Sequence, residues 1–240
     1  MQLIANLDCR CTLGEGVVYD DQTDCLLWVD IIEKKFYVYA LSDEKLSVYD
    51  LPYRLGSFGL TNTAGTIIAA FEKGFAYYAW LTGELNWICR VEEHIPYTRL
   101  NDGRVDRSGR FWAGSMVESD KKCASPELAQ RAEKGTLYGL DSQGIAQPML
   151  GDIQISNSLC WSPDGKILYH TDTPTRTIYA YAYDQIQQRL SDKKVLVETA
   201  PNCYPDGSCV DAAGNVWNAQ WGGWQVQCFS PSGEVLQTLT

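Results

Sequence analysis

Three oxygen-bearing side chains stand in turn-like settings at the starts of sequence repeats. They are Glu15 in LGEG, Asn157 in ISNSLCWSPDG and Asp206 in YPDGSCVDAAGN. Two carboxylates and one amide make a hard-oxygen ligand set suited to Ca²⁺, Mg²⁺ or Mn²⁺, with water or substrate completing the shell. Glu, Asn and Asp also occur in turns for purely conformational reasons, so spacing alone does not group these three residues.

Other common catalytic sites are poorly supported. The chain has neither G-x-S-x-G nor H-E-x-x-H, and His94 and His170 are its two histidines. A His-rich metal site and a conventional catalytic triad are therefore close to excluded. Carboxylates and amides must carry any chemistry.

The elements that must position these residues are short strands. Runs of four to six residues rich in Val, Ile, Tyr, Trp and Leu alternate with Gly, Asp, Asn and Ser turns along the whole chain. Related turn and strand segments recur as DQTDCLLWVD, NTAGTIIAAF, DRSGRFWAGS, SPDGKILYHTD and DAAGNVWNAQ. Their equivalent points, Asp24, Gly65, Gly109, Gly165 and Gly214, are about 41, 44, 56 and 49 residues apart. A second hairpin follows each segment, so the pattern predicts an all-β fold, a β-propeller of four-stranded blades with about five blades countable.

Two features interrupt this regularity. The long third spacing is explained by an inserted segment, Ser125 to Gly135, with Ser at a plausible N-cap, Pro at the first helical position and Gly at the stop. It predicts a short helix, with a solvated loop as the alternative. Trp28, Trp112 and Trp217 occupy similar places in their repeats and are expected to pack between blades, whereas Trp221 and Trp224 either line a pocket mouth or pack.

Composition narrows the class of protein. The formal charge of −10 and the lack of a Lys/Arg stripe disfavour nucleic-acid binding. No signal-like start or membrane-length apolar run is present, so a cytoplasmic protein is the expectation. Nine scattered cysteines favour reduced thiols over a disulfide scaffold, and the C-x-C pair Cys9 and Cys11 lacks a second Cys/His pair at zinc-finger distance. The sequence does not indicate an oligomeric state.

At these motifs the sequence resembles the SMP-30/gluconolactonase/regucalcin family of sugar lactonases, over nearly the whole chain. The resembling stretches are LGEGVVYD, LLWVDI, RLNDGRVDRSGRFWAGSM, GTLYGLD, ISNSLCWSPDG, LYHTDT, IYAYAYD, PDGSCVDAAGNVWNAQWGG and PSGEVLQTL. The resemblance implies a six-bladed propeller with one divalent metal ion held by Glu15, Asn157 and Asp206. Ca²⁺ is the preferred ion, and Zn²⁺, Mn²⁺, Mg²⁺ or Fe²⁺ fit the same ligands.

The resemblance also implies a substrate site. The R-x-N-D-G segment contacts the sugar in that family, which matches Arg99 and Asn101 here. Family members often place a Glu shortly after the G-T-M strand, whereas GSMVESDKK has Glu118 one residue earlier and Ser119 in its place. A shift of one residue reverses the face of a strand, so Glu118 is the less supported candidate for substrate binding.

The implied reaction is metal-dependent hydrolysis of a sugar lactone to the aldonic acid. Asp206 would be both metal ligand and general base, with a hydroxide held by the metal as the alternative base. Two other functions stay open: an arylesterase or phosphotriesterase on the same fold, and a calcium-binding or regulatory propeller without catalysis.

Residues 1–240 are predicted to form a single β-propeller domain. The resemblance ends at LQTLT, where family chains continue for about one more blade. The C-terminal blade is thus expected to be missing or incomplete. A truncated product, a five-bladed variant and a chain that continues beyond this sequence are the open explanations.

Overall fold

The computed structural model describes residues 7–118 and 134–240, and these residues are almost entirely strands and turns. One three-residue 3₁₀ turn, η2 (Thr173–Thr175), interrupts the strands. The predicted helix over 125–135 falls mostly outside the described residues, and its last residue, Gly135, begins a strand. The described part of the chain holds no helix of the length and apolarity that crossing a membrane requires.

Twenty strands of the described residues form five antiparallel sheets of four strands each, which confirms the predicted all-β propeller with five countable blades. The first sheet comprises β1 (Gly14–Asp20), β2 (Cys25–Asp30), β3 (Lys35–Ala40) and β4 (Lys45–Asp50). The second comprises β5 (Leu55–Leu60), β6 (Thr66–Phe71), β7 (Gly74–Ala79) and β8 (Glu84–Arg90). The third comprises β9 (Thr98–Val105), β10 (Phe111–Val117), β11 (Gly135–Leu140) and β12 (Ala146–Ile153). The fourth comprises β13 (Ser156–Trp161), β14 (Ile167–Asp172), β15 (Thr177–Asp184) and β16 (Arg189–Glu198). The fifth comprises β17 (Tyr204–Val210), β18 (Val216–Trp221), β19 (Gln225–Phe229) and β20 (Val235–Leu239).

The turn between the first two strands of each sheet carries the repeat signal. All five equivalent points predicted from the sequence have positive φ: Asp24 at 53°, Gly65 at 73°, Gly109 at 88°, Gly165 at 71° and Gly214 at 88°. This left-handed conformation costs glycine little, and Asp tolerates it better than most residues, which explains the residue types at this position. The structure therefore confirms the repeat register.

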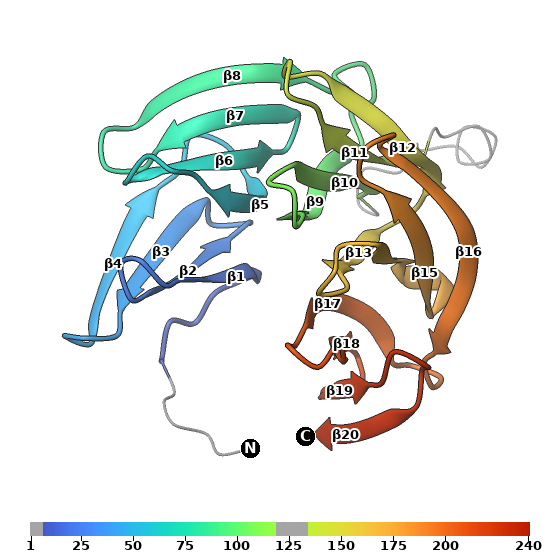
Figure 1. The fold of residues 1–240 in the computed structure, drawn as a ribbon. Coiled ribbons are helices and arrows are strands. Elements are labelled where there is room, and N and C mark those ends of the chain that lie inside the picture. The colour runs from blue at the N-terminus through green and yellow to red at the C-terminus, as the bar shows by residue number, and fades with distance from the viewer. Residues whose placement is uncertain (1–6, 119–133) are drawn as a thin grey trace.

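The five sheets are arranged around a central axis with the first strand of each sheet innermost (Figure 1). The innermost strands contact one another in series, β1 with β5, β5 with β9, β9 with β13 and β13 with β17. Hydrophobic clusters fill each of these boundaries, as where Val29 and Phe36 of the first sheet pack with Leu55 and Ile67 of the second. Packing between blades thus fixes where the starts of the innermost strands meet.

The tryptophan prediction holds best at the boundary between the third and fourth sheets. Trp112 is fully buried, makes edge contacts with Trp161 and Tyr183, and donates from its indole nitrogen to Asp106 at 3.0 Å. Trp217 donates in the same way to Asp211 at 3.0 Å, so the two repeats share this bond.

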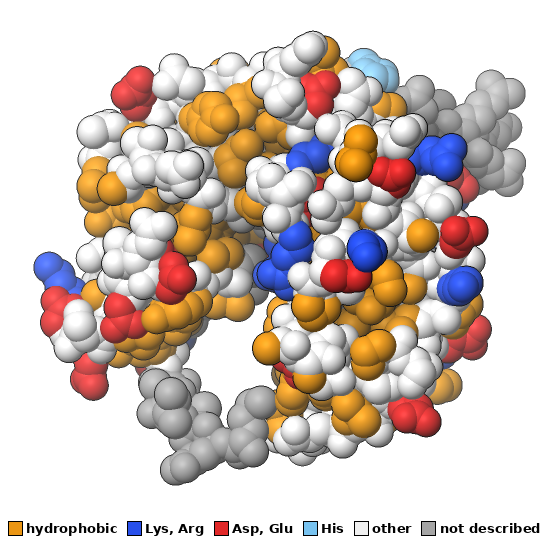
Figure 2. Space-filling model, viewed as in Figure 1, with side chains coloured by type: hydrophobic (Ala, Val, Ile, Leu, Met, Phe, Trp, Pro, Cys, Tyr) orange, Lys and Arg blue, Asp and Glu red, His pale blue; other side chains and the backbone are white. Residues whose placement is uncertain are grey.

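The first and fifth sheets flank an open side of the ring, with residues 7–13 and strand β20 beside it (Figure 1). Figure 2 shows the same opening in the space-filling view, with hydrophobic side chains along its first-sheet side. On that side, Leu7, Cys9 and Cys11 of the N-terminal segment pack against a small cluster that contains Trp28 and Tyr37.

Candidate functional site

The innermost strands that carry the predicted ligands are kinked beside those residues. Strand pairing shifts register between Glu15 and Val18 in β1, between Asn157 and Cys160 in β13, and just after Pro205 in β17. Bulges of this kind bend a strand and re-aim its side chains, and they are frequent beside active sites. The bulges therefore give side chains at these positions an orientation that regular pleating would not.

A chain of hydrogen bonds fixes the amide of Asn157, which is 6% exposed. Its Nδ2 donates to the Thr173 hydroxyl at 2.9 Å, and that hydroxyl donates to the Pro205 carbonyl at 2.9 Å. Because a hydroxyl has one hydrogen, Thr173 can only accept from Asn157. The amide oxygen is thereby turned the other way, where it accepts from Asn101 Nδ2 at 3.2 Å.

Three carboxylates come close enough to perturb one another. Burial, followed by the charges of Asp206 and Asp102, raises the pKa of Glu15 to about 8, while Arg99 acts in the opposite direction. Burial raises the pKa of Asp102 to about 6, although the Leu159 N–H and Arg104 oppose this and Asp206 adds to it. Burial also raises the pKa of Asp206, against a hydrogen bond from the Gly207 N–H. The charged forms of these three carboxyl groups are therefore disfavoured, and a cation bound among them would favour those charged forms.

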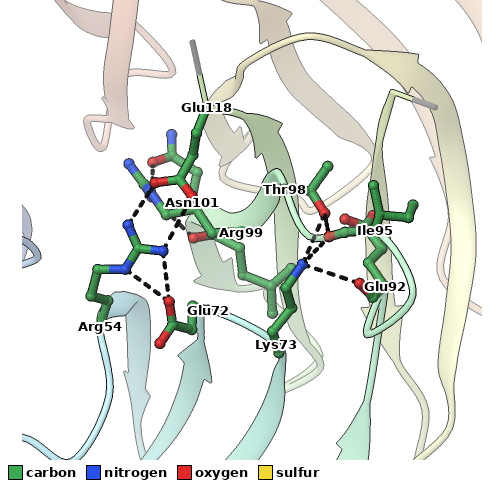
Figure 3. A network of polar contacts seen from close by, with 10 residues as sticks. Arg54, Glu72, Lys73, Glu92, Ile95, Thr98, Arg99, Asn101 and Glu118 are labelled. Carbon is green, nitrogen blue, oxygen red and sulfur yellow. Dashed lines mark hydrogen bonds and ion pairs between the residues drawn. The ribbon is translucent and has the colours of Figure 1, made fainter. Parts of the chain in front are cut away.

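A network of charged side chains adjoins these three carboxyl groups through Arg99 (Figure 3). Arg99 donates from Nη1 to Asn101 Oδ1 at 2.7 Å, and its Nε lies 3.8 Å from Glu118 Oε1. Arg54 donates to Glu118 at 2.5 Å and to Glu72 at 2.6 Å. Glu118, which is 8% exposed, thus lies in the same network as Arg99 and Asn101. Ser119 lies outside the described residues.

The side chains present fit a hard divalent ion. Glu15 and Asp206 would supply carboxylate oxygens, and Asn157 would supply an amide oxygen whose orientation is fixed by Thr173. Such all-oxygen sets suit Ca²⁺ and similar ions. Within residues 7–118 and 134–240 no cluster of three His, Cys, Asp or Glu side chains has metal-binding geometry, and the candidate ligand set combines two such carboxylates with an amide.

Two other features lie apart from this site. A pocket of about 550 Å³ is lined by Ser108, Gly109, Asp141 and Gln185, at the turns that lie beyond the far ends of β9, β11 and β15. It contains none of the predicted site residues. Trp221 and Trp224 are 68% and 90% exposed, so neither is buried between blades.

Sequence reasoning missed several residues of this site. Asp102 lies in the R-x-N-D-G segment, directly after Asn101, and an acidic residue there was a usable signal. Thr173 belongs to LYHTDT, where nothing in the sequence links it to Asn157. Arg54 and Glu72 flank strands β5 and β6 of the second sheet and pair with each other. Arg54 reaches Glu118 of the third sheet only because of the ring geometry.

The Thr173 hydroxyl offers a test of this arrangement. Thr173→Val is expected to weaken divalent-metal affinity by about 10-fold, because residues that orient metal ligands typically contribute this much. Thr175→Val, in the same turn but exposed, should leave affinity unchanged, and Thr173→Ser should restore it. Titration calorimetry measures all three, and equal affinities for Thr173→Val and wild type would show that Asn157 needs no such anchor.

Comparison with known proteins gives the family. The model of the SMP-30/gluconolactonase/LRE-like region matches residues 13–240. This chain is a member of that family. It is 34% identical to 6-deoxy-6-sulfogluconolactonase of Pseudomonas putida, over 95% of this chain and 75% of that protein. It is also 34% identical to L-arabinolactonase of Azospirillum brasilense, over 94% and 73% of the two chains.

A solved structure supports the same fold. The calcium-binding protein regucalcin of Agrobacterium tumefaciens superimposes with a TM-score of 0.84 at 26% identity. The superposition covers 95% of this chain and 74% of that one. The resemblance stated from the motifs is therefore confirmed at the level of family and fold.

Proposed function

We propose that this protein hydrolyses a sugar lactone to the aldonic acid with the help of one divalent metal ion held by Glu15, Asn157 and Asp206. The observation that supports the proposal most is electrostatic: burial, followed by the charges of Asp206 and Asp102, raises the pKa of Glu15 to about 8. The hydrogen bond to Thr173 also fixes the amide oxygen of Asn157. Lactonase relatives in the same family support the reaction class. Ca²⁺ is the proposed ion, since a relative of known structure is described as calcium-binding.

Arg99 and Asn101 are proposed to bind the sugar. Their hydrogen bonds within the described residues use both hydrogens of Arg99 Nη1 and both hydrogens of Asn101 Nδ2. Within the described part of the chain, Arg99 Nη2 retains donors and Asn101 Oδ1 retains a lone pair. A donor beside an acceptor suits a hydroxyl group, which needs both.

The charge of the neighbouring network favours a neutral ring. Arg54 is paired with Glu72 and Glu118, and Arg99 also lies beside Glu118. Two guanidinium groups and two carboxylates balance, which leaves little net charge for an anionic substituent to neutralise. Glu118 is thereby proposed to hold Arg99 in position next to the sugar, instead of binding the sugar alone.

The chemistry requires addition of water to the lactone carbonyl carbon and cleavage of the ring C–O bond. A divalent ion bound at this site would supply Lewis-acid polarisation of the carbonyl. Asp206 is proposed to accept the proton of the attacking water and to return it to the departing ring oxygen, which becomes a hydroxyl group. Arg99 and Asn101 hold the ring so that the carbonyl carbon faces that water.

A δ-aldonolactone assay with and without chelator tests this function. Acid release in a pH-stat is expected to exceed the buffer rate, to fall at least about 100-fold after chelation and to return on addition of Ca²⁺ or Mn²⁺, because the ion stabilises developing charge. An aryl ester and a phosphotriester serve as alternative substrates. Preference for either of them over the lactone would favour the esterase alternative, and metal binding without turnover would favour the calcium-binding one.

A further inference from the structure

The C-x-C pair of the N-terminal segment is not used by the proposed reaction, yet its two sulfur atoms lie together. Cys9 Sγ and Cys11 Sγ are 3.9 Å apart. In a regular extended chain such residues share a face but their side chains stand farther apart, because two residues advance the strand by about 7 Å. A local bend must bring the sulfurs together.

Arg10 supplies that bend. Its φ of 43° is left-handed, which is uncommon for a residue other than Gly. Its guanidinium makes a two-pronged contact with the Asp8 carboxylate, at 2.8 and 3.0 Å. This exposed ion pair accompanies the bend, while the two thiols pack toward the first sheet. The segment is thus folded around its cysteines.

Cys9 and Cys11 pack against a cluster of aromatic side chains. The Trp28 and Tyr37 rings stack with centroids 5.1 Å apart, and Cys9 and Cys11 pack on the cluster that contains them. Burial raises the pKa of the Cys11 thiol, and hydrogen bonds from Trp28 and Tyr37 oppose that rise. Both groups therefore present donors that would stabilise a thiolate at Cys11.

We propose that Cys9 and Cys11 form a chelating dithiol that binds one soft monovalent metal ion of the Cu(I) class. Metal–thiolate bonds are about 2.3 Å long for zinc, so the two sulfurs at 3.9 Å need to separate by less than about 1 Å to lie on opposite sides of one ion. A disulfide would instead require them to approach to about 2.05 Å. Thiolates favour Cu(I) and Zn²⁺ over hard ions. Structural zinc takes four ligands, whereas two thiolates are sufficient for Cu(I). The cluster on which the pair packs consists of Trp28, Tyr37 and Tyr39, and these side chains offer no thiolate, imidazole or carboxylate ligand.

Binding of Cu(I) is accompanied by loss of the thiol protons of Cys9 and Cys11. Two thiols become two thiolates as the ion binds, so two protons are released per Cu(I) and no electron is transferred. The pair is partly exposed, which gives an ion access without unfolding. This dithiol site is distinct from the proposed divalent-metal site of Glu15, Asn157 and Asp206, whose carboxylate and amide ligands suit hard ions.

Competition with a chromogenic Cu(I) chelator under anaerobic, reducing conditions tests the proposal on the full chain. Wild type is expected to retain one Cu(I) per chain and to release two protons in weakly buffered solution. Cys9→Ser and Cys11→Ser should each weaken the tightest site at least about 100-fold, whereas Cys209→Ser, at an exposed cysteine of the fifth sheet, should bind as wild type does.

Trp28→Phe keeps an aromatic ring against the two cysteines but removes the indole N–H, so it is expected to weaken Cu(I) binding only a few-fold. Thermal unfolding of the metal-free variants checks that each is folded. Unchanged Cu(I) affinity in both Cys9→Ser and Cys11→Ser, or an equal loss in Cys209→Ser, would overturn the assignment.

Discussion

Asp206→Asn is expected to lower kcat/KM for a δ-aldonolactone by about 10³-fold, within the range that a positioned general base contributes. The substitution removes a negative charge and a proton acceptor with almost no change in size. It should spare the fold, because Ser158 Oγ and Asn218 Nδ2 bond to the backbone carbonyl of Asp206, at 2.6 and 3.1 Å, and not to its carboxylate.

A matched control separates catalysis from general charge effects. Asp43→Asn makes the same change at an exposed carboxylate in the turn between β3 and β4, and it should retain wild-type kcat/KM. Unfolding of Asp206→Asn should occur within a few degrees of wild type. Wild-type turnover in Asp206→Asn would exclude Asp206 as the base and as an essential ligand.

The metal-free protein is expected to lose stability as the pH rises. Glu15 has a pKa of about 8 in the fold against an ordinary value of 4.5, so across this interval the folded protein holds a proton that the unfolded chain has released. Because the folded state binds more protons there, the free energy of unfolding falls with rising pH. The effect is on the order of 2 kcal/mol, after a reduction for solvent screening of a side chain that is only partly buried.

Thermal unfolding of chelated protein measures this effect. The midpoint is expected to be about 4–8 °C lower at about pH 8 than at about pH 5.5, and Ca²⁺ should raise it most at the higher pH. Glu15→Gln removes the titrating group and should flatten both dependences. A midpoint that rises with pH in chelated wild type, or the same pH profile in Glu15→Gln, would contradict the electrostatic description of this site.

Much of the fold was predictable because the same turn recurs in each repeat and requires particular residue types. Asp24 and Gly109 each take a left-handed conformation at the same point of a hairpin, and the sequence shows residues that tolerate it. Trp112 and Trp217 likewise repeat one bond to the Asp that opens the turn. Short-range rules of this kind act within a few residues, so a single sequence reveals them.

The site was only partly predictable because its contacts depend on the ring. Asn157 and Asp206 could be chosen as oxygen ligands from residue type and motif, and their roles stay a proposal. The hydroxyl of Thr173 bonds to Asn157, which lies 16 positions earlier in the chain. Arg54 pairs with Glu118, which lies 64 positions later and beside a different sheet. No local pattern marks such pairs, because the first depends on how strands β13 and β14 pair and the second on how neighbouring blades pack.

Glu118 shows how a local strand pattern and the contacts made in the folded ring combine. The one-residue shift in GSMVESDKK made Glu118 the less supported candidate for substrate binding. Its position just after β10 lets its backbone N–H bond to the Tyr97 carbonyl at 2.8 Å, and its carboxylate reaches Arg54 and Arg99. The face of a strand is therefore a weak guide at the point where the strand ends.

A crystal structure of the protein soaked with Mn²⁺, with the ion located by its anomalous scattering, tests the central claim most directly. The expected result is one strong peak within about 2.0–2.6 Å of oxygen atoms of Glu15, Asn157 and Asp206, the range in which hard ions bind oxygen. A lactonase-active protein whose ion lies elsewhere, or which shows no peak among these three side chains, would contradict the proposed metal site.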